Sequence, residues 1–351
     1  MTDISTATAT IVHALAGAPV GGAENFYTRL VCRLADDGSM AHHAFTRPNA
    51  ARESQLRQSR VPIQTFRFGS ALRLDDRLRY RRALTRLAPD LVLTYMNRAS
   101  GLTPVGDYTL VCRLGHYYDL KYYRHADYWI GISKGICKHM IDGGFPTDRV
   151  FHIPNFADET PVEPVPRNSF ETDPGRPLLL AAGRLHVNKA YDTLLDAFVQ
   201  VPDATLWIAG EGPEQDRLQD QARRLGIADR IRWLGWRTDV VALMKTADAF
   251  VCPSRHEGLG SIVMESWFAG CPIVATDSQG PGEAIDHDRT GIITPVDEPA
   301  PLTDALSAVL GDPQLRKRLA KAGAQEYAAN YSAAVITSSY LTLFRDLLSR
   351  R

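Results

Sequence analysis

The sequence lacks any apolar run long enough to cross a membrane, because polar residues interrupt every stretch well short of about 18 residues. It has only five cysteines in 351 residues, an odd number without a C-x-x-C pair. This scarcity argues against a disulfide framework or a cysteine-based zinc site and predicts free, mostly buried thiols in a reducing compartment. The sequence also lacks net charge, with 40 basic and 40 acidic residues, which argues against a nucleic-acid-binding protein.

Several common catalytic and nucleotide-binding motifs are also missing. No G-x-G-x-x-G follows a predicted strand and no G-x-x-x-x-G-K-[ST] is present, which counts against nicotinamide or flavin oxidoreductases and P-loop NTPases. H-E-x-x-H and the nucleophile elbow G-x-S-x-G are absent as well. Asp286 and Asp288 form a D-x-D pair, a pattern that can hold a metal, but the adjoining R-T-G favours a plain turn. We therefore expect no metal site.

The balance of charge conceals an uneven distribution. Residues 1–160 contain 20 basic and 15 acidic residues, whereas residues 161–351 contain 20 and 25. Within Arg47–Arg86 there are eleven arginines and three acidic residues. This block has two interpretations, a solvated helix face or a surface that meets an anionic partner. Because the N-terminus lacks the basic region of a secretory signal, we expect a cytoplasmic protein.

Short apolar or β-branched runs alternate with helix-period segments along the chain. The first series of predicted strands extends from Thr8–Leu15 to Val150–Pro154, and the second from Pro177–Ala182 to Gly291–Thr294. Such alternation indicates parallel sheets built from right-handed βαβ units. The sequence therefore predicts an α/β protein with two doubly wound, Rossmann-like sheets facing each other across a cleft, with ligands at the carboxyl ends of the strands.

A proline-rich segment separates the two series of strands. Residues 159–177 contain five prolines and little that can form a core, which is typical of a linker. We expect a first domain at 1–160, a linker at 161–176 and a second domain at 177–335. The remaining residues, 336–351, are expected to form a helix that crosses back to the first domain.

The first candidate site lies between the first predicted strand and the first helix, at Gly21, Gly22 and Glu24. Consecutive glycines let the backbone approach a ligand closely, and the following helix N-terminus offers free N–H groups. Glu24 also has a purely structural interpretation, because a carboxylate in the first turn suits the helix dipole.

The second candidate site follows the first strand of the second series. Gly183-Arg184 and, five residues after the arginine, Lys189 place two cations where a strand gives way to a helix. Arginine can bind a pyrophosphate through two parallel hydrogen bonds and lysine can bind it as a point charge. The alternative is a pair of ordinary surface cations.

The third and most specific candidate is the segment E-G-L-G-S-I-V-M-E that begins at Glu257. Gly258 and Gly260 let this loop approach a ligand, and the helix predicted to start at Ser261 can receive a phosphate at its N–H groups. Glu265 lies about one turn into that helix, where a carboxylate can accept hydrogen bonds from the vicinal hydroxyls of a ribose. Two carboxylates beside a diphosphate are explained if they bind hydroxyls, because like charges would otherwise repel.

These motifs together resemble those of a known enzyme family. Glu257 and Glu265 match its E-x7-E motif, Gly183-Arg184 with Lys189 match its G-R-x(n)-K phosphate clamp, and Gly21–Glu24 matches its G-G-x-E loop. The sequence resembles a retaining glycosyltransferase of the GT-B fold, in the large bacterial family 4 (glycosyl transferases group 1). The resemblance implies transfer of a sugar from a nucleotide diphosphosugar with retention at the anomeric carbon. It implies no cofactor and no required metal.

The resemblance also assigns roles to individual residues. Arg184 and Lys189 would stabilise the departing diphosphate, Glu257 would bind the donor sugar, and Glu265 would bind the ribose. The residues implied at the donor are Gly21, Gly22, Gly183, Arg184, Lys189, Trp236, Glu257, Gly258, Leu259, Gly260, Ser261 and Glu265. The residues implied in catalysis are His116, Arg184, Lys189 and Glu257. The first domain would bind the acceptor, with contacts from Glu24 and Asn97.

Two of these roles have structural alternatives, and two positions depart from the family pattern. His116 lies where the family often places a histidine near the reacting sugar, but it can equally be a strand-end packing residue. Trp236 lies where the family lines the base pocket, but it can equally belong to the core. Ala190 replaces the glycine that usually follows the lysine, and Phe156 replaces the glycine of a P-N-G-x-D hinge.

The acceptor and the donor are less sharply defined. We expect a UDP-sugar first and GDP-mannose next, and a lipid-linked or saccharide acceptor in lipopolysaccharide or other envelope glycan synthesis. The resemblance implies that the Arg47–Arg86 block meets an anionic membrane surface, so that the protein associates peripherally with the inner face of the cell membrane. Two alternatives remain open, a non-transferase GT-B enzyme such as a UDP-sugar epimerase and a two-domain sugar-binding protein.

Overall fold

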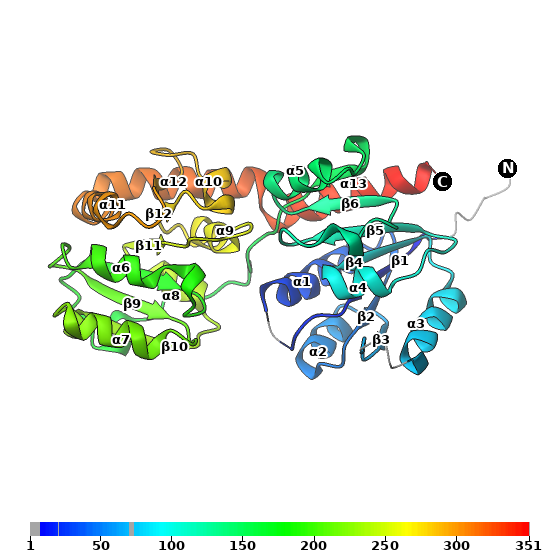
Figure 1. Ribbon diagram of the computed structural model, residues 1–351, viewed down its shortest axis with the longest axis horizontal. Helices are drawn as coiled ribbons and strands as arrows, with labels where there is room; N and C mark the ends of the chain where they lie inside the picture. The colour runs from blue at the N-terminus through cyan, green and yellow to red at the C-terminus, as the bar shows by residue number, and fades with distance from the viewer. Residues whose placement is uncertain (1–7, 20, 70–73, 351) are drawn as a thin grey trace. The chain divides into compact units, whose positions relative to one another are not determined.

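Figure 1 shows the chain in a computed structural model, which describes residues 8–19, 21–69 and 74–350. The chain divides into two compact units. Unit 1 contains the described residues up to Asn155 and those from Ala333 onward, and unit 2 spans Phe156–Ser332. Across the described ranges, no helix combines the length and the apolar character that crossing a membrane requires.

Unit 1 is built on a parallel sheet of seven strands in the order β3-β2-β1-β4-β5-β6-β7. The strands are β1 (Thr10–Leu15), β2 (Ala41–Thr46), β3 (Ile63–Thr65), β4 (Leu91–Tyr95), β5 (Thr109–Leu114), β6 (Tyr128–Gly131) and β7 (Val150–His152). The central strands β1, β4 and β5 are buried along nearly their whole length, as expected for parallel strands covered on both faces. The strand order reverses direction between β1 and β4, which makes the sheet doubly wound.

The helices of unit 1 flank this sheet (Figure 1). They are α1 (Gly22–Asp37), α2 (Ala50–Gln58), α3 (Leu74–Leu87), α4 (Met96–Leu102), α5 (Lys134–Asp142) and α13 (Ala333–Ser349). Side chains cap two of them, because Asn49 accepts a hydrogen bond at the start of α2 and Ser133 accepts one at the start of α5. Gly38 ends α1 in a left-handed conformation (φ 73°), which glycine adopts without strain.

The C-terminal helix α13 is part of unit 1. The Arg113 guanidinium is buried at the end of β5, where its Nε donates to the Tyr340 hydroxyl on α13 at 2.8 Å. The same guanidinium donates to Asn155 Oδ1 and lies 4.4 Å from the ring centroid of Phe26 on α1. Arg113 thus joins the sheet, α1, α13 and the end of the first chain segment.

Unit 2 repeats the same architecture with a parallel sheet of six strands in the order β10-β9-β8-β11-β12-β13. The strands are β8 (Leu178–Ala182), β9 (Thr205–Ala209), β10 (Ile231–Gly235), β11 (Ala249–Cys252), β12 (Ile273–Thr276) and β13 (Ile292–Thr294). The helices are α6 (Tyr191–Phe198), α7 (Gln215–Arg224), α8 (Val240–Thr246), α9 (Ser261–Phe268), α10 (Gln279–Ala284), α11 (Pro299–Gly311) and α12 (Pro313–Asn330). The order reverses between β8 and β11, so this sheet is also doubly wound.

The proline-rich segment expected to be a linker is packed into unit 2. Val165 N donates to the carbonyl of Ala242 at 3.3 Å, and Arg167 forms an ion pair of 2.7 Å with Asp248. The prolines disfavour regular secondary structure in this segment, but a hydrogen bond and an ion pair attach the segment to unit 2. Along the sequence, unit 2 begins after Asn155 and ends at Ser332.

The predicted strands agree with the structure to within a few residues at their ends, and the segment after Asp312 is helical as predicted. The exception is β3, which sequence reasoning missed. This strand has three residues and none of them is fully buried, so its sequence has no apolar pattern that would predict a strand. Four of the five cysteines are buried, which confirms the prediction that most of the thiols are buried.

Candidate active site

The predicted cations and carboxylates of unit 2 lie on two loops at the carboxyl ends of neighbouring strands. β8 pairs with β11, and the strand order reverses between them. The loop after β8 carries Arg184 and Lys189, and the loop after β11 carries Glu257 and leads into α9. In doubly wound folds, ligands bind outside the carboxyl ends of the strands at such a switch point.

Lys189 and Glu257 form an ion pair at this point, with Lys189 Nζ donating to Glu257 Oε2. The two side chains are only 26% and 19% exposed. Burial by itself would lower the pKa of Lys189, but Glu257 and the other groups around it together outweigh burial, so the pKa of Lys189 is raised. Glu265 on α9 raises the Lys189 pKa further. Lys189 therefore carries its positive charge in this site at neutral pH.

Backbone and arginine contacts hold the two loops together. The carbonyl of Asn188 accepts from the backbone N–H groups of Arg255 and His256, at 2.8 and 3.3 Å. The Arg255 side chain donates to the Val187 carbonyl at 2.7 Å, and it also pairs with Asp192. These contacts place Glu257, two residues beyond Arg255, against Lys189, two residues beyond Val187.

Close backbone packing explains the glycines around the site. A Cβ on Gly210 would lie 1.9 Å from the carbonyl oxygen of Gly183, and one on Gly212 would lie 2.2 Å from that of Leu185. A Cβ on Gly280 would lie 2.2 Å from the backbone of Leu259. The loops after β8, β9, β11 and β12 therefore pack backbone against backbone, and side chains at these positions would separate them.

The loop after β11 ends in the N-terminus of α9. Gly260 is the N-cap residue in a left-handed conformation (φ 69°), and the helix begins at Ser261. Gly258 is half-buried and Leu259 is buried. Glu265 lies half-buried within α9. The N-terminus of α9, with its partial positive charge, and the Lys189 ammonium on the neighbouring loop both favour an anion in this region.

Two of the predicted donor residues are exposed around this cluster. Arg184 is exposed, and among the described residues no carboxylate forms an ion pair with it. Trp236 follows β10 with 57% of its surface exposed, and its backbone N–H donates to Glu211 Oε1 at 3.2 Å. The exposed ring rules out the interpretation of Trp236 as a core residue.

In unit 1, Gly21 and Glu24 form a compact turn. Glu24 is buried and its Oε1 accepts from Ala18 N at 2.6 Å. A Cβ on Gly21 would lie 2.3 Å from Glu24 Oε2, and one on Gly17 would lie 2.3 Å from Oε1. A side chain at position 21 would therefore clash with the Glu24 carboxylate, whereas a Cβ at Gly22 would meet no atom within 4 Å.

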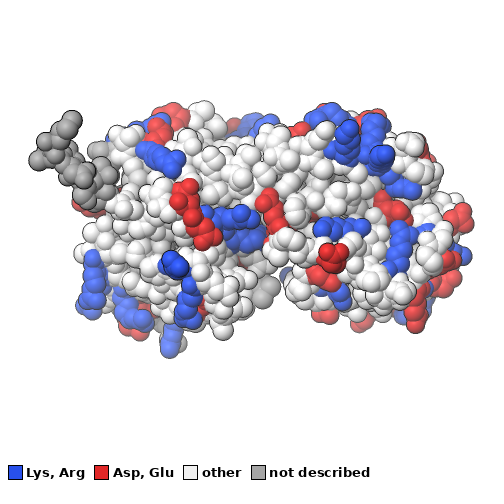
Figure 2. Space-filling view, turned by 180° about the vertical axis from the view of Figure 1, so that it is seen from behind, with Lys and Arg blue, Asp and Glu red and all other residues white. Residues whose placement is uncertain are grey.

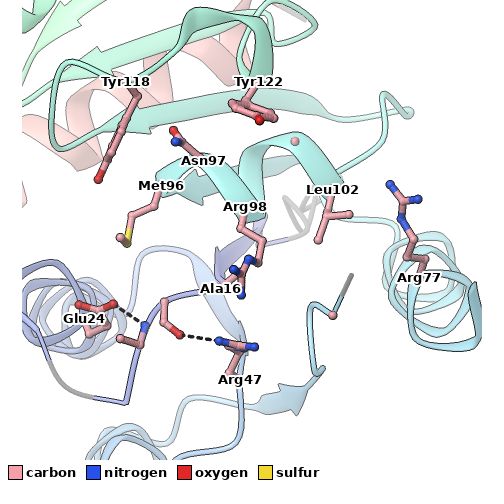
Figure 3. A pocket seen from close by; sticks show the side chains of 14 residues that line it. Ala16, Glu24, Arg47, Arg77, Met96, Asn97, Arg98, Leu102, Tyr118 and Tyr122 are labelled. Carbon is pink, nitrogen blue, oxygen red and sulfur yellow. Dashed lines mark hydrogen bonds between the residues drawn. The ribbon is translucent and has the colours of Figure 1, made fainter. Parts of the chain in front are cut away.

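Glu24 also lines a pocket of about 830 Å³ in unit 1 (Figure 3). Asn97, at the start of α4, lines the same pocket, and its Oδ1 accepts from the Tyr123 hydroxyl. The structure thus brings both predicted acceptor residues together. His116 is exposed after β5, with ring centroid distances of 6.0 Å to Tyr117 and 5.8 Å to Tyr118. Its exposure argues against a packing role.

Sequence reasoning missed most of the pocket lining. Arg47 follows β2, Arg98 lies on α4 after β4, and Tyr118 follows β5. The signal that could have found them is their position, because each follows the carboxyl end of a strand of a doubly wound sheet. No motif marks these positions.

The structure also bears on the D-x-D pair. The carbonyl of Asp286 accepts from Thr290 N at 2.9 Å, and the Asp286 side chain pairs with Arg289 at 2.5 Å. This is the plain turn that the sequence predicts. Within the part of the chain that the structure describes, no three histidine, cysteine or acidic side chains are grouped as a metal site requires.

Comparison with known proteins places this arrangement in a family. Residues 164–326 match the model of "Glycosyl transferases group 1". The chain is 31% identical over 327 residues to the lipopolysaccharide core biosynthesis glycosyltransferase LpsE of Rhizobium meliloti, covering 92% of this chain and 95% of that protein. It is 30% identical to LpsD of the same organism, covering 94% and 97%. The chain belongs to the glycosyl transferases group 1 family.

This glycosyltransferase has the GT-B fold. The crystal structure of Anabaena HepE in complex with UDP and glucose superimposes with a TM-score of 0.79 at 21% identity, covering 97% of this chain and 100% of that one. The family assignment favours a transferase over the epimerase and the sugar-binding protein left open by the sequence. The matched region contains Arg184, Lys189, Glu257 and Glu265.

Proposed function

We propose that this glycosyltransferase moves a sugar from a UDP-sugar to a saccharide acceptor of the lipopolysaccharide core, with retention at the anomeric carbon and without a metal. The relatives LpsE and LpsD are named for lipopolysaccharide core biosynthesis, which supports the acceptor class. HepE was solved with UDP and glucose, which supports a UDP-sugar over GDP-mannose. The match to E-x7-E and G-R-x(n)-K supports the retaining chemistry of family 4.

The observation that carries the proposal is the Lys189–Glu257 pair at the β8/β11 switch point. Lys189 lies on a loop that packs against the loop leading into α9, and a cation and a helix N-terminus both favour the negative charge that develops on a departing diphosphate. Glu257 partly neutralises Lys189 before the donor binds. A carboxylate there is suited to the hydroxyls of the donor sugar.

The remaining donor residues surround this pair. Arg184 is exposed and supplies a second cation for the diphosphate, and Glu265 binds the ribose hydroxyls from α9. The exposed Trp236 ring offers a stacking face for the base. We also assign His116 a role in catalysis, as the family resemblance implies. No side chain is required as the base, because the donor phosphate accepts the acceptor proton in this proposal.

A transfer assay with product analysis tests the proposed reaction. UDP-glucose and UDP-galactose are incubated with truncated lipopolysaccharide core as acceptor, and the anomeric configuration of the product is determined by NMR. We expect an α-glycosidic product and full activity in excess EDTA, since protein cations replace a metal. A β-linked product, or activity that EDTA abolishes and Mg²⁺ restores, would contradict retention or metal independence respectively.

We further propose that part of the basic region meets an anionic membrane surface. On α3, Arg79, Arg82 and Arg86 are exposed, although residues 70–73 of the Arg47–Arg86 block lie outside the described residues. Figure 2 shows one face of the molecule, on which basic side chains gather over the lower part of unit 1. Each arginine near an anionic surface contributes about 1 kcal/mol.

Liposome co-sedimentation tests the membrane proposal. We expect salt-sensitive binding to vesicles that contain anionic lipid, and at least tenfold weaker binding by the double variant Arg82→Glu, Arg86→Glu. Neutral vesicles and an exposed charge reversal on unit 2, Lys317→Glu, are the controls. Equal binding of both variants and the unaltered chain would exclude this surface.

A further inference from the structure

The pocket in unit 1 lies at the carboxyl edge of its sheet, next to the switch point between β1 and β4. Its volume of about 830 Å³ falls within the range of about 300–1,000 Å³ typical of small-molecule sites. Its walls come from Ala16–Ala18 after β1, from Met96–Arg98 after β4 and from Tyr118 after β5 (Figure 3). The pocket thus has the same relation to its sheet as the Lys189–Glu257 pair has to the sheet of unit 2.

Three arginines line this pocket against a single carboxylate. Arg47 follows β2, Arg77 lies on α3 and Arg98 lies on α4, and Figure 3 shows the Arg98 side chain extending from α4 toward Arg47. No carboxylate of the described chain forms an ion pair with any of the three. Glu24, the one acidic residue of the lining, is already engaged by Ala18 N. The lining therefore carries two positive charges in excess.

Two neighbouring arginines of the basic block differ from these three, because their guanidinium groups have partners of their own. Arg57 pairs with Glu53 at 2.8 Å, and Arg52 is buried with its guanidinium donating to Thr46 Oγ1 and to backbone carbonyls. Arg47 is held in place by backbone oxygens alone, since its Nε donates to the carbonyl of Arg67 at 2.9 Å. A guanidinium fixed in this way keeps donors for an anionic group.

The rest of the lining suits a sugar. Tyr118 and Tyr122 provide aromatic surface, and Tyr122 is 40% exposed. Asn97 has its Oδ1 occupied by the Tyr123 hydroxyl, which leaves the amide nitrogen as a donor for a hydroxyl oxygen. Met96 adopts a left-handed conformation (φ 66°) at the junction of β4 and α4. Such strain in a non-glycine residue is concentrated at functional sites, and here it sets the start of the helix that carries Asn97 and Arg98.

We propose that this pocket selects an acceptor sugar that bears an anionic group, a carboxylate or a phosphate, and discriminates against neutral sugars. Arg47 and Arg98 bind the anionic group, Arg77 adds positive charge at the far side of the pocket, and Glu24 and Asn97 bind hydroxyls of the same sugar. This inference rests on the proposed transferase function and deepens it by naming the acceptor chemistry. Two of these arginines, Arg47 and Arg77, belong to the Arg47–Arg86 block. Part of the block would therefore recognise the acceptor, independently of any contact with a membrane.

Binding of three small probes to the full chain tests the proposal. Methyl α-glucuronide carries a carboxylate, methyl α-glucoside 6-phosphate carries a phosphate, and methyl α-glucoside carries neither. We expect at least one charged probe to bind at least tenfold more tightly than the neutral probe in titration calorimetry, with binding that weakens as salt rises. The tighter of the charged probes identifies the anionic group. Equal affinities for all three, or no binding of either charged probe, would overturn the proposal.

Variants separate recognition by these arginines from general charge. Arg98→Gln is expected to weaken binding of the charged probe at least tenfold, and Arg98→Lys to restore part of it, because lysine keeps the charge without the two-pronged hydrogen bonding. Arg81→Gln, on the same helix as Arg77 but outside the pocket, is the matched control and should bind the charged probe normally. Loss of binding in Arg81→Gln equal to that in Arg98→Gln would contradict the assignment.

The proposed function is measured separately in the same preparation. Release of UDP from a UDP-sugar without acceptor reports on the donor site alone. Absence of this release with intact charge-selective probe binding would refute the UDP-sugar donor and leave the anion pocket standing. UDP release with no preference for charged probes would refute the pocket alone.

Discussion

Lys189 and Glu257 are brought together by residues that do not themselves belong to a catalytic motif. Asn188 and Arg255 tie the two loops, and the glycines behind them permit backbone packing that a side chain would prevent. Ala190, which replaces the usual glycine, adopts a left-handed conformation (φ 49°). This conformation costs a non-glycine residue about 1–2 kcal/mol. Lys189 nevertheless remains paired with Glu257.

Replacing Lys189 tests the donor site at the scale of one residue. We expect Lys189→Ala to lower kcat/KM by about 10²–10³, or roughly 3–4 kcal/mol of transition-state stabilisation, because a preorganised cation facing the departing diphosphate is lost. Thermal unfolding should change little, since Lys189 and Glu257 are both partly exposed. The exposed Lys317→Ala serves as the control. Near-normal turnover of the donor by Lys189→Ala would remove the assignment.

Glu265→Ala gives a second test that separates binding of the nucleotide from the chemistry. Because Glu265 is assigned to the ribose hydroxyls, its loss should weaken the binding of free UDP at least tenfold, as well as lower kcat/KM. Glu265→Gln retains hydrogen-bonding capacity and should show a smaller effect. Calorimetric titration with UDP measures both. Unchanged UDP affinity in Glu265→Ala would show that the carboxylate does not contact the nucleotide.

At the scale of elements, a buried arginine joins α13 to the sheet of unit 1, in addition to the buried apolar face of the helix. Arg113 has its hydrogen-bonding groups directed at Tyr340 and Asn155, and its guanidinium lies over the Phe26 ring. A buried guanidinium whose donors are all satisfied stabilises a structure, whereas one left with an unsatisfied donor destabilises it.

Removing the Tyr340 hydroxyl tests this anchor. Tyr340→Phe leaves Arg113 Nε without its acceptor and should lower the free energy of unfolding by about 1–3 kcal/mol. Ser338→Ala, at an exposed position of the same helix, should change it by less than about 0.5 kcal/mol. Urea unfolding followed by circular dichroism measures both. Equal stabilities for the two variants would show that α13 does not depend on this contact.

Two buried histidines link the neighbouring strands β1 and β2. His13 Nε2 and His42 Nδ1 are hydrogen-bonded at 2.9 Å, and His13 Nδ1 contacts the Tyr95 hydroxyl at 3.1 Å. Burial lowers the pKa of His13 well below its ordinary value and lowers that of His42 to about 4. Both rings are therefore neutral in the folded protein near pH 6.

The stability of unit 1 should accordingly fall on acidification. The unfolded chain takes up protons at these histidines below about pH 6.5, whereas the folded chain does not until about pH 4 at His42. Each histidine then destabilises the fold by about 1.4 kcal/mol per pH unit within that window. Urea unfolding at pH 7.5, 6 and 5 should show this loss, and His42→Gln should make it shallower. The exposed His152→Gln should not. A flat stability between pH 7.5 and 5 would contradict this expectation.

At the scale of the whole molecule, two doubly wound sheets present their candidate ligand residues at equivalent places. In unit 1 the pocket lies beside β1 and β4, and in unit 2 the ion pair lies beside β8 and β11. In each sheet these are the strands between which the order reverses. One topological rule therefore locates both candidate sites.

The sequence predicts much of this arrangement and misses the part without a motif. The alternation of apolar runs locates nearly all strands, and the spacing of Glu257 and Glu265 predicts the donor loop. By contrast, no motif marks the three arginines of the unit 1 pocket. Arg47 and Arg77 belong to the basic block, and Arg98 is an isolated basic residue. The place of all three around one pocket depends on the order of the strands in the sheet, which local spacing does not encode. The sequence also does not show that Arg52 is buried, which indicates a structural role, or that Trp236 is exposed, which argues against one.

The central claim is that unit 2 holds a nucleotide diphosphosugar at Lys189, Glu257 and Glu265. The most direct measurement is the release of nucleoside diphosphate from a panel of UDP-, GDP- and ADP-sugars, without acceptor, by the unaltered chain and by Lys189→Ala. We predict slow release of UDP from at least one UDP-sugar, reduced at least a hundredfold in Lys189→Ala. Release from none of the donors, or equal release by both proteins, would contradict this claim.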